Sequence, residues 1–133
     1  MLEHVAIWTR NLEEMKEFYC DFFNGKAGEK YESTSEFHAG FESYFINFGE
    51  GSRLELMKMI TIPDGINSNG HEAIGITHIA FSAKTTGEVD GLAKKARSEG
   101  YTVVLEPHKT GDGYYEACIL DPDGNRVEVT VLP

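Results

Sequence analysis

The spacing of apolar residues along the chain predicts two helices. In the first, apolar side chains recur every three or four residues, as they do on one face of a helix: Leu12, Met15, Phe18, Tyr19 and Phe22. Asn11 is placed to cap the first turn, and Gly25 to end the helix. A second helix is expected over residues 86–99, with Gly100 at its end.

Alternation of apolar and polar residues predicts the strands. Residues 4–8 and 78–82 alternate in this way shortly before the two helices. Three further strands are expected after each helix: 27–33, 42–48 and 53–59 in the first half, and 102–106, 113–120 and 125–132 in the second. Asp121-Pro122-Asp123-Gly124 joins the last two, because Pro presets one turn angle and Gly accepts a positive φ.

The two halves also repeat in sequence. His4–Trp8 (HVAIW) matches His78–Ser82 (HIAFS) at an offset of 74 residues, and Arg53–Leu56 (RLEL) matches Arg126–Val129 (RVEV) at an offset of 73. Such self-similarity indicates a duplicated structural unit. We therefore predict an α+β protein of two βαβββ modules, residues 1–60 and 76–133. A linker over 61–75 would join them into a single domain of residues 1–133, with a mixed, curved sheet around a metal site.

Four polar residues recur on the strand faces that turn away from the predicted helices. Because alternate side chains of a strand point to opposite sides, the apolar faces pack on the helices and leave His4, Glu55, His78 and Glu128 on the other face. Two imidazoles and two carboxylates suit Ni²⁺ or Zn²⁺, and also Co²⁺, Mn²⁺ or Fe²⁺. The pattern predicts one divalent ion that acts as a Lewis acid beside a carboxylate able to move a proton.

A structural interpretation competes with the metal site. A single His at the start of an apolar strand is more often a hydrogen-bonded structural residue, and a Glu flanked by leucines is usually an exposed strand position. Duplication explains a repeated backbone, but it does not require both halves to keep the same two ligand types. The joint pattern therefore favours the four-ligand site over a vestigial, metal-free repeat.

Composition narrows the class of partner. Twelve basic against twenty-two acidic residues give a net charge of −10, which disfavours nucleic acid and anionic membranes. The chain opens without the basic and apolar regions of a signal peptide, and it contains no apolar run near 18 residues. We expect a cytoplasmic protein with a small-molecule substrate, in which Cys20 and Cys118 are free thiols.

These residues resemble the vicinal oxygen chelate superfamily, and most of all glyoxalase I, the lactoylglutathione lyase family. The resemblance covers nearly the whole chain, and the closing segment from Asp121 to Glu128 (DPDGNRVE) is its most specific part. It implies the glyoxalase/bleomycin resistance/dioxygenase fold, a homodimer, and one Ni²⁺ or Zn²⁺ held by His4, Glu55, His78 and Glu128. It also implies isomerisation of the thiol hemithioacetal of a small 2-oxoaldehyde through an enediolate, with Glu128 as the base, or Glu55 by pseudo-symmetry.

The resemblance leaves the substrate open. Bacterial relatives typically have a basic residue four positions after the first His, where this chain has Trp8, with Arg10 two residues later. Trp8, Arg10, Arg53 and Arg126 are predicted to bind substrate. His38, His71 and His108 have no repeat partner and are interpreted as surface or loop residues, although His108 lies in a segment expected near the substrate.

Two alternatives are retained. The first is a superfamily epimerase, although those enzymes usually have Gln where Glu55 stands. The second is a non-catalytic protein that binds a small molecule, such as an antibiotic, without a metal.

Overall fold

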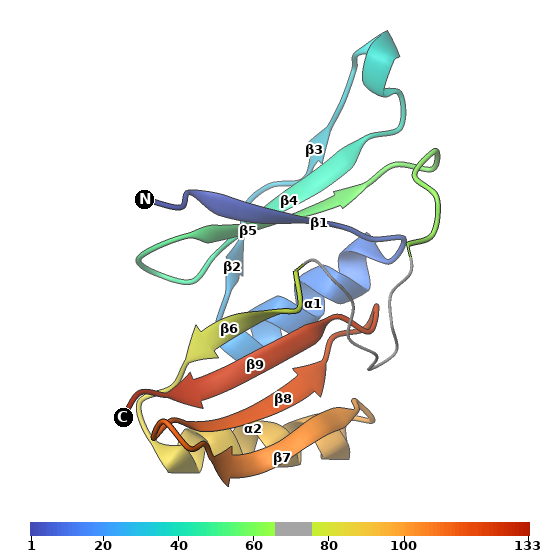
Figure 1. The fold of residues 1–133 in the computed structure, drawn as a ribbon. Coiled ribbons are helices and arrows are strands. Elements are labelled where there is room, and N and C mark those ends of the chain that lie inside the picture. The colour runs from blue at the N-terminus through green and yellow to red at the C-terminus, as the bar shows by residue number, and fades with distance from the viewer. Residues whose placement is uncertain (66–75) are drawn as a thin grey trace. The chain divides into compact units, whose positions relative to one another are not determined.

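The computed structural model describes residues 1–65 and 76–133. It divides into two compact units, Met1–Gly65 and Ile66–Pro133, and each unit is a mixed sheet with one helix (Figure 1). The expected linker over 61–75 lies largely outside the described residues, as do His71 and Gly75.

The first unit contains five strands and the first helix. In chain order the elements are β1 (His4–Trp8), α1 (Leu12–Phe23), β2 (Lys26–Ala27), β3 (Tyr31–Glu32), the 3-10 helix η1 (Glu36–His38), β4 (Glu42–Asn47) and β5 (Arg53–Lys58). The sheet order is β1-β5-β4-β2, and β3 also pairs with β4. β1 runs parallel to β5, whereas the other pairs are antiparallel.

The second unit repeats this plan. Its elements are β6 (His78–Ser82), α2 (Thr86–Ser98), β7 (Val103–Lys109), β8 (Tyr115–Leu120) and β9 (Arg126–Val131). The strands lie side by side in the order β6-β9-β8-β7, with β6 parallel to β9 (Figure 1). The α+β architecture of two βαβββ modules is therefore confirmed, with one open sheet in each unit.

Each helix packs its apolar stripe on one face of its own sheet. All five predicted α1 residues are buried, and they face β4 and β5, where Ile46, Leu54 and Leu56 are also buried. In α2 the buried residues are Val89, Ala93 and Ala96, and they face a surface that includes Val127 and Val129. The helices thus cover the apolar faces that alternation predicts and leave the His and Glu faces uncovered by helix.

Turns and caps match the sequence at several points. Thr85 caps α2 by accepting a hydrogen bond from the backbone N–H of Glu88, and Gly100 follows the helix with a φ of 85°. In the final hairpin Gly124 has a φ of 84°, and the Asp121 carboxylate accepts from the backbone N–H of Asp123 at 3.0 Å and of Asn125 at 2.9 Å. This is the turn that the sequence predicts.

Three details differ from the prediction in the first unit. Asn11 directly precedes α1, but its side chain makes no capping hydrogen bond, and its backbone N–H donates to the Thr9 hydroxyl at 2.9 Å. α1 ends at Phe23 with Asn24 in the left-handed conformation, so Asn24, and not Gly25, supplies the positive φ. The single strand expected over 27–33 is two short strands. Their register with β4 shifts by one residue between Ala27 and Tyr31, which inserts an extra residue as in a bulge.

Gly25 is instead required by packing. A Cβ atom at this position would lie 2.6 Å from the Cγ2 of Ile46 and 2.9 Å from the Cε1 of Phe48. Ile46 is fully buried, so it has little room to move. Gly25 therefore allows the chain to pass close to β4 as it leaves α1.

A polar cluster holds the start of α1 to the sheet. The Glu13 carboxylate lies 3.1 Å from the Nζ of Lys16 and 3.1 Å from the Nζ of Lys30, and it accepts a hydrogen bond from the Tyr44 hydroxyl. Lys30 also pairs with Glu42 on β4 at 2.9 Å. These contacts, led by the one with Lys16, lower the pKa of Glu13 from 4.5 to about 2.

We expect Gly25→Ala to lower the free energy of unfolding by about 1–3 kcal/mol, because the added methyl group overpacks against Ile46 and Phe48. The matched control is Gly91→Ala inside α2, where a Cβ atom meets nothing within 4 Å. That change should raise the free energy of unfolding by about 0.5–1 kcal/mol, because Ala is more favourable than Gly in the interior of a helix. Denaturant unfolding measures both, and an unaltered Gly25→Ala protein would contradict the packing argument.

We expect the Glu13 cluster to make a pH-dependent contribution to stability. A carboxyl group whose pKa is lowered on folding stabilises the protein above its unfolded pKa of 4.5, and this contribution is lost as the pH falls towards 2. Because Glu13 is about half exposed, Glu13→Gln should cost at most about 1 kcal/mol at pH 7. The difference from wild type should shrink between pH 4.5 and 3. Glu17→Gln on the same helix is the control. If the difference in free energy of unfolding between wild type and Glu13→Gln does not change with pH, the ionic origin of the stabilisation is refuted.

Candidate functional site

In the first unit, His4 and Glu55 lie side by side on the face away from α1. Parallel pairing of β1 with β5 sets Ala6 opposite Glu55, so His4 is two residues away on the same face. The Nε2 of His4 lies 3.6 Å from an Oε of Glu55. The imidazole is 39% exposed and the carboxylate 15% exposed, so the pair is open at the imidazole end.

The second unit repeats this geometry at the equivalent residues. Ala80 lies opposite Glu128 in the parallel pairing of β6 with β9, which again places His78 two residues away on the same face. The Nε2 of His78 lies 3.5 Å from an Oε of Glu128. Within both units the first and last strands are therefore neighbours, and each pairing sets a His beside a Glu.

The donor set fits a divalent ion, two ligands to a unit. Both separations exceed the length of a direct hydrogen bond, whereas adjacent ligands of an ion bound at about 2.1 Å lie about 3 Å apart. A small closing movement would therefore bring each pair onto one ion. Among residues 1–65 and 76–133, no group of three or more His, Cys, Asp or Glu side chains is arranged to hold a metal. Each unit offers one His and one Glu of the four candidate ligands.

Glu128 sits in a more desolvated setting than an ordinary surface carboxylate. Burial raises its pKa above 4.5, Glu116 raises it further, and His78 and His108 oppose the shift. Glu116 and His108 come from β8 and β7, and their registers place them on the same face as Glu128. The Nε2 of His108 lies 4.0 Å from an Oε of Glu116, and its Nδ1 lies 2.8 Å from the Glu106 carbonyl oxygen.

His108 and Glu116 show where sequence reasoning fell short. His108 was expected in a loop, but it lies on β7, which runs three residues further than predicted and pairs with β8 through an irregular register. Glu116 was not singled out, because it has no counterpart among the residues that repeat and it directly precedes an apolar run, Ala117–Leu120. Together they extend the polar face of the second unit beyond the His78–Glu128 pair.

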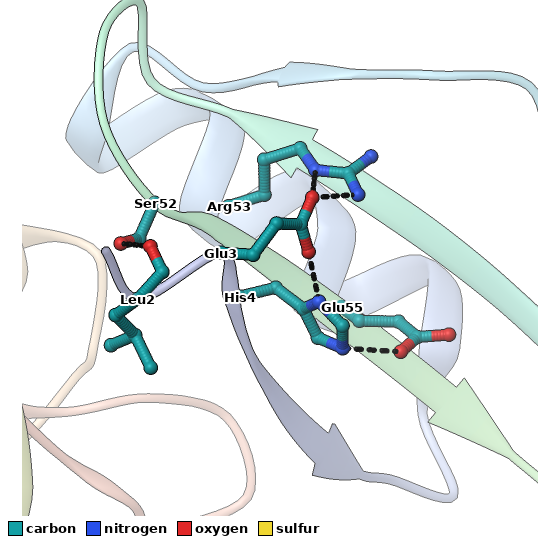
Figure 2. A network of polar contacts seen from close by, with 6 residues as sticks. All are labelled: Leu2, Glu3, His4, Ser52, Arg53 and Glu55. Atoms are coloured by element: carbon teal, nitrogen blue, oxygen red, sulfur yellow. Dashed lines mark hydrogen bonds and ion pairs between the residues drawn. The ribbon is translucent and has the colours of Figure 1, made fainter.

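In the first unit, Glu3 and Arg53 adjoin His4 (Figure 2). The Nε of Arg53 donates to one oxygen of Glu3 at 2.8 Å, a second guanidinium nitrogen contacts the same oxygen, and the other Glu3 oxygen contacts the Nδ1 of His4. The hydrogen bond with His4, followed by that with Arg53, lowers the pKa of Glu3. Sequence analysis did not identify Glu3, because Thr77 occupies its place in the repeat.

The residues predicted to bind substrate lie in three settings. Arg53 and Arg126 are the register partners of His4 and His78, so each lies on the ligand-bearing face of its own unit. Trp8 lies on the His4 face and makes an edge-on ring contact with Phe41 at 6.0 Å. Arg10 donates to Asp64 at 2.6 Å and to the Ile62 carbonyl at 2.8 Å, which ties the turn before α1 to the chain after β5.

A polar cleft of about 330 Å³ lies at the start of α1. Its walls include Arg10, Glu13, Lys30, Glu42 and Lys58. Glu42 and Lys58 are register partners that alternate with Ser43 and Met57, so they belong to the face covered by α1. The cleft therefore lies on the opposite side of the sheet from His4 and Glu55 and is separate from the candidate metal ligands.

Two further sequence expectations concern the chain as a whole. Cys20 and Cys118 are both free thiols, as expected. None of the described helices is long and apolar enough to cross a membrane.

Comparisons with known proteins agree with this architecture. The chain is 36% identical over 59 residues to the uncharacterized protein YqjT of Bacillus subtilis (strain 168), a match that covers 42% of this chain and 46% of YqjT. The structure is similar to lactoylglutathione lyase from Agrobacterium tumefaciens, with 25% identity, a TM-score of 0.67, and coverage of 98% of this chain and 92% of that one.

A third relative is larger. A V278E mutant of glyoxalase I from Zea mays matches with 22% identity and a TM-score of 0.75 over 97% of this chain. The chain spans only 43% of that protein's length, so the likeness shows the fold alone.

The family assignment rests on a match along almost the whole sequence. A family model described as the Glyoxalase/Bleomycin resistance protein/Dioxygenase superfamily matches residues 1–129. That match includes both parallel strand pairs and all four candidate ligands. The chain therefore belongs to the Glyoxalase/Bleomycin resistance protein/Dioxygenase superfamily.

Proposed function

We propose that this protein is a metal-dependent lyase or isomerase of the glyoxalase I type. Its substrate would be a small 2-oxoaldehyde or the hemithioacetal that such an aldehyde forms with a thiol. The observation that carries the proposal is the repeated His–Glu pair, with nearly equal separations of 3.6 and 3.5 Å at equivalent strand positions. A repeat kept only for packing would not need this polar pair in both units.

His4, Glu55, His78 and Glu128 would hold one divalent ion, Ni²⁺ or Zn²⁺ in the first place. Two neutral imidazoles and two carboxylates balance the charge of such an ion. When bound, the ion supplies Lewis-acid stabilisation of the negative charge that develops on a substrate oxygen. Glu55 also separates this chain from the epimerases, which usually have Gln at that position.

Glu128 would move the proton. Its carboxylate would remove the proton from the substrate carbon that bears the hydroxyl and sulfur, which leaves an enediolate, and would return it to the neighbouring carbon. The hydroxyl proton passes to the neighbouring oxygen, so the product is a thioester of a 2-hydroxy acid. A base near neutral pH works best when its pKa is raised towards the working pH, and burial moves Glu128 in that direction. Glu55 occupies the pseudo-equivalent position and is the alternative base.

The polar and aromatic residues around the pairs would orient the substrate. Trp8 offers an apolar wall on the His4 face, while Arg126, Glu116 and His108 share the face of Glu128. Arg10 is engaged by Asp64 and the Ile62 carbonyl, so a substrate anion would have to compete with those contacts. The lactoylglutathione lyase structure that resembles this chain supports a thiol adduct as the substrate class.

We also infer a homodimer. β1 and β6 each form an edge of their sheet, and each carries one of the candidate His ligands. Unpaired strand edges are commonly covered by another copy or another element. Pairing between copies is therefore consistent with a site assembled from two units.

Metal analysis and one variant test the proposed activity. Protein purified without chelator should contain about one divalent ion per chain, because four ligands are available for it. Glu128→Gln should keep the fold and lower kcat for methylglyoxal with a thiol by about 100-fold to 10,000-fold, since the proton acceptor is removed. Glu99→Gln at the end of α2 is the control and should retain activity.

The outcomes separate a metal-dependent lyase from a binding protein and also test the substrate class. Absence of bound metal after incubation with Ni²⁺, Zn²⁺, Mn²⁺ and Co²⁺ would refute the lyase and favour a binding protein. Bound metal without turnover of methylglyoxal in the presence of any thiol would exclude this substrate class.

Sedimentation velocity tests the assembly. We expect the mass of a dimer at the protein concentrations used for metal titration. A stable monomer that still binds one ion tightly would exclude a site shared between two chains and would assign all four ligands to one chain.

A further inference from the structure

We propose that Glu3 and Arg53 form a positioning pair that holds the imidazole of His4 in one tautomer, with its Nε2 free to bind a metal and directed at Glu55. This inference rests on the proposed metal site. It assigns to Glu3 and Arg53 a role that they exert through the candidate ligand His4. Arg53 then serves first to hold Glu3 in place, before any contact with substrate. The chain of contacts runs from the Arg53 guanidinium through the Glu3 carboxylate to His4 and ends at Glu55 (Figure 2).

Backbone and ring contacts fix the start of this chain. Arg53 donates its backbone N–H to the Glu3 carbonyl at 2.9 Å, and the Ser52 hydroxyl donates to the Leu2 carbonyl at 2.5 Å. The Arg53 guanidinium lies over the Phe45 ring, 4.0 Å from its centroid, and His4 meets the same ring edge-on at 5.5 Å. Phe45 therefore supports both the cation that orients Glu3 and the imidazole that Glu3 contacts.

Hydrogen-bond chemistry then determines the tautomer. An ionised carboxylate can only accept, so its contact with His4 requires the proton to be on Nδ1. In a neutral imidazole this leaves the lone pair on Nε2, the nitrogen that lies 3.6 Å from Glu55. A lone pair and a carboxylate oxygen that face each other cannot share a hydrogen bond without another proton, but both can bind a cation placed between them.

The second unit lacks this carboxylate and provides an internal control. Thr77 precedes His78 where Glu3 precedes His4, while Arg126 occupies the place of Arg53. Cys118 lies opposite Glu128, in the place of Phe45 opposite Glu55. The His–Glu separations nevertheless agree to within 0.1 Å, so the pair geometry itself does not depend on the carboxylate. The units therefore differ in the residue that precedes the His, and not in the His–Glu separation.

A purely stabilising salt bridge is a poor explanation. The Glu3 side chain is 59% exposed and that of Arg53 is 34% exposed, and exposed ion pairs contribute little to stability. The role of Glu3 in orienting His4 can therefore be separated from its role in folding.

Imidazole ¹⁵N NMR on the metal-free protein tests the proposal at about pH 8, where a free imidazole is neutral. In wild type, His4 should carry its proton on Nδ1. In Glu3→Ala it should move predominantly to Nε2, whereas His78 should not change. Glu3→Asp, which keeps a carboxylate, should restore part of the Nδ1–H population. Thr77→Glu, which places a carboxylate before His78, should shift His78 towards the Nδ1–H tautomer.

Zn²⁺ titration by calorimetry gives the second readout. Loss of a partner that orients a His ligand typically weakens metal affinity by about 10-fold to 100-fold, and we expect this from Glu3→Ala. An Nε2–H tautomer of His4 in wild type, or the same tautomer in wild type and Glu3→Ala, overturns the proposal even if the protein binds metal. If wild type binds no metal but shows the expected tautomers, the orientation of His4 by Glu3 is supported. In that case only the proposed function is refuted.

Discussion

Parallel pairing of the first and last strands in each unit is the constraint on which the candidate site depends. In a parallel pair the register fixes which side chains share a face and how far apart they lie. His4 and Glu55, like His78 and Glu128, are offset by two residues in that register, so the imidazole reaches across to the carboxylate at about the spacing of two metal ligands. A slip of one residue in either pairing would turn the Glu towards the helix and abolish that half of the site.

The two units keep this geometry while differing in what surrounds it. In the first unit, Glu3, Arg53 and Phe45 pack around His4 and constrain its ring. In the second, Glu116 and His108 lie on the face of Glu128, and burial raises the pKa of Glu128. The first unit thus surrounds its His with fixed partners, and the second surrounds its Glu with further titratable residues.

The sequence allowed much of this to be predicted, and the failures have physical causes. Alternation located the strands and the faces of His4 and Glu55, because a period of two is directly visible in the sequence. It did not locate the break near Gly28 or the extension of β7 to Lys109, because both depend on register with a neighbouring strand. Gly25 was assigned to the helix end because its close approach to Ile46 is a tertiary contact. Glu3 was missed because the search relied on repetition, and Glu3 is the position at which the repeat fails.

A small residue lies beside each His–Glu pair. The residues opposite Glu55 and Glu128 are Ala6 and Ala80, each lying two residues after the His of its strand. A larger side chain there would occupy the face between the imidazole and the end of the strand, where an ion and two substrate oxygens would have to fit. Both alanines are exposed in their own units, so neither contributes much to a core. Small residues at these two positions are therefore compatible with the proposed metal site, because they leave the space beside each His–Glu pair open.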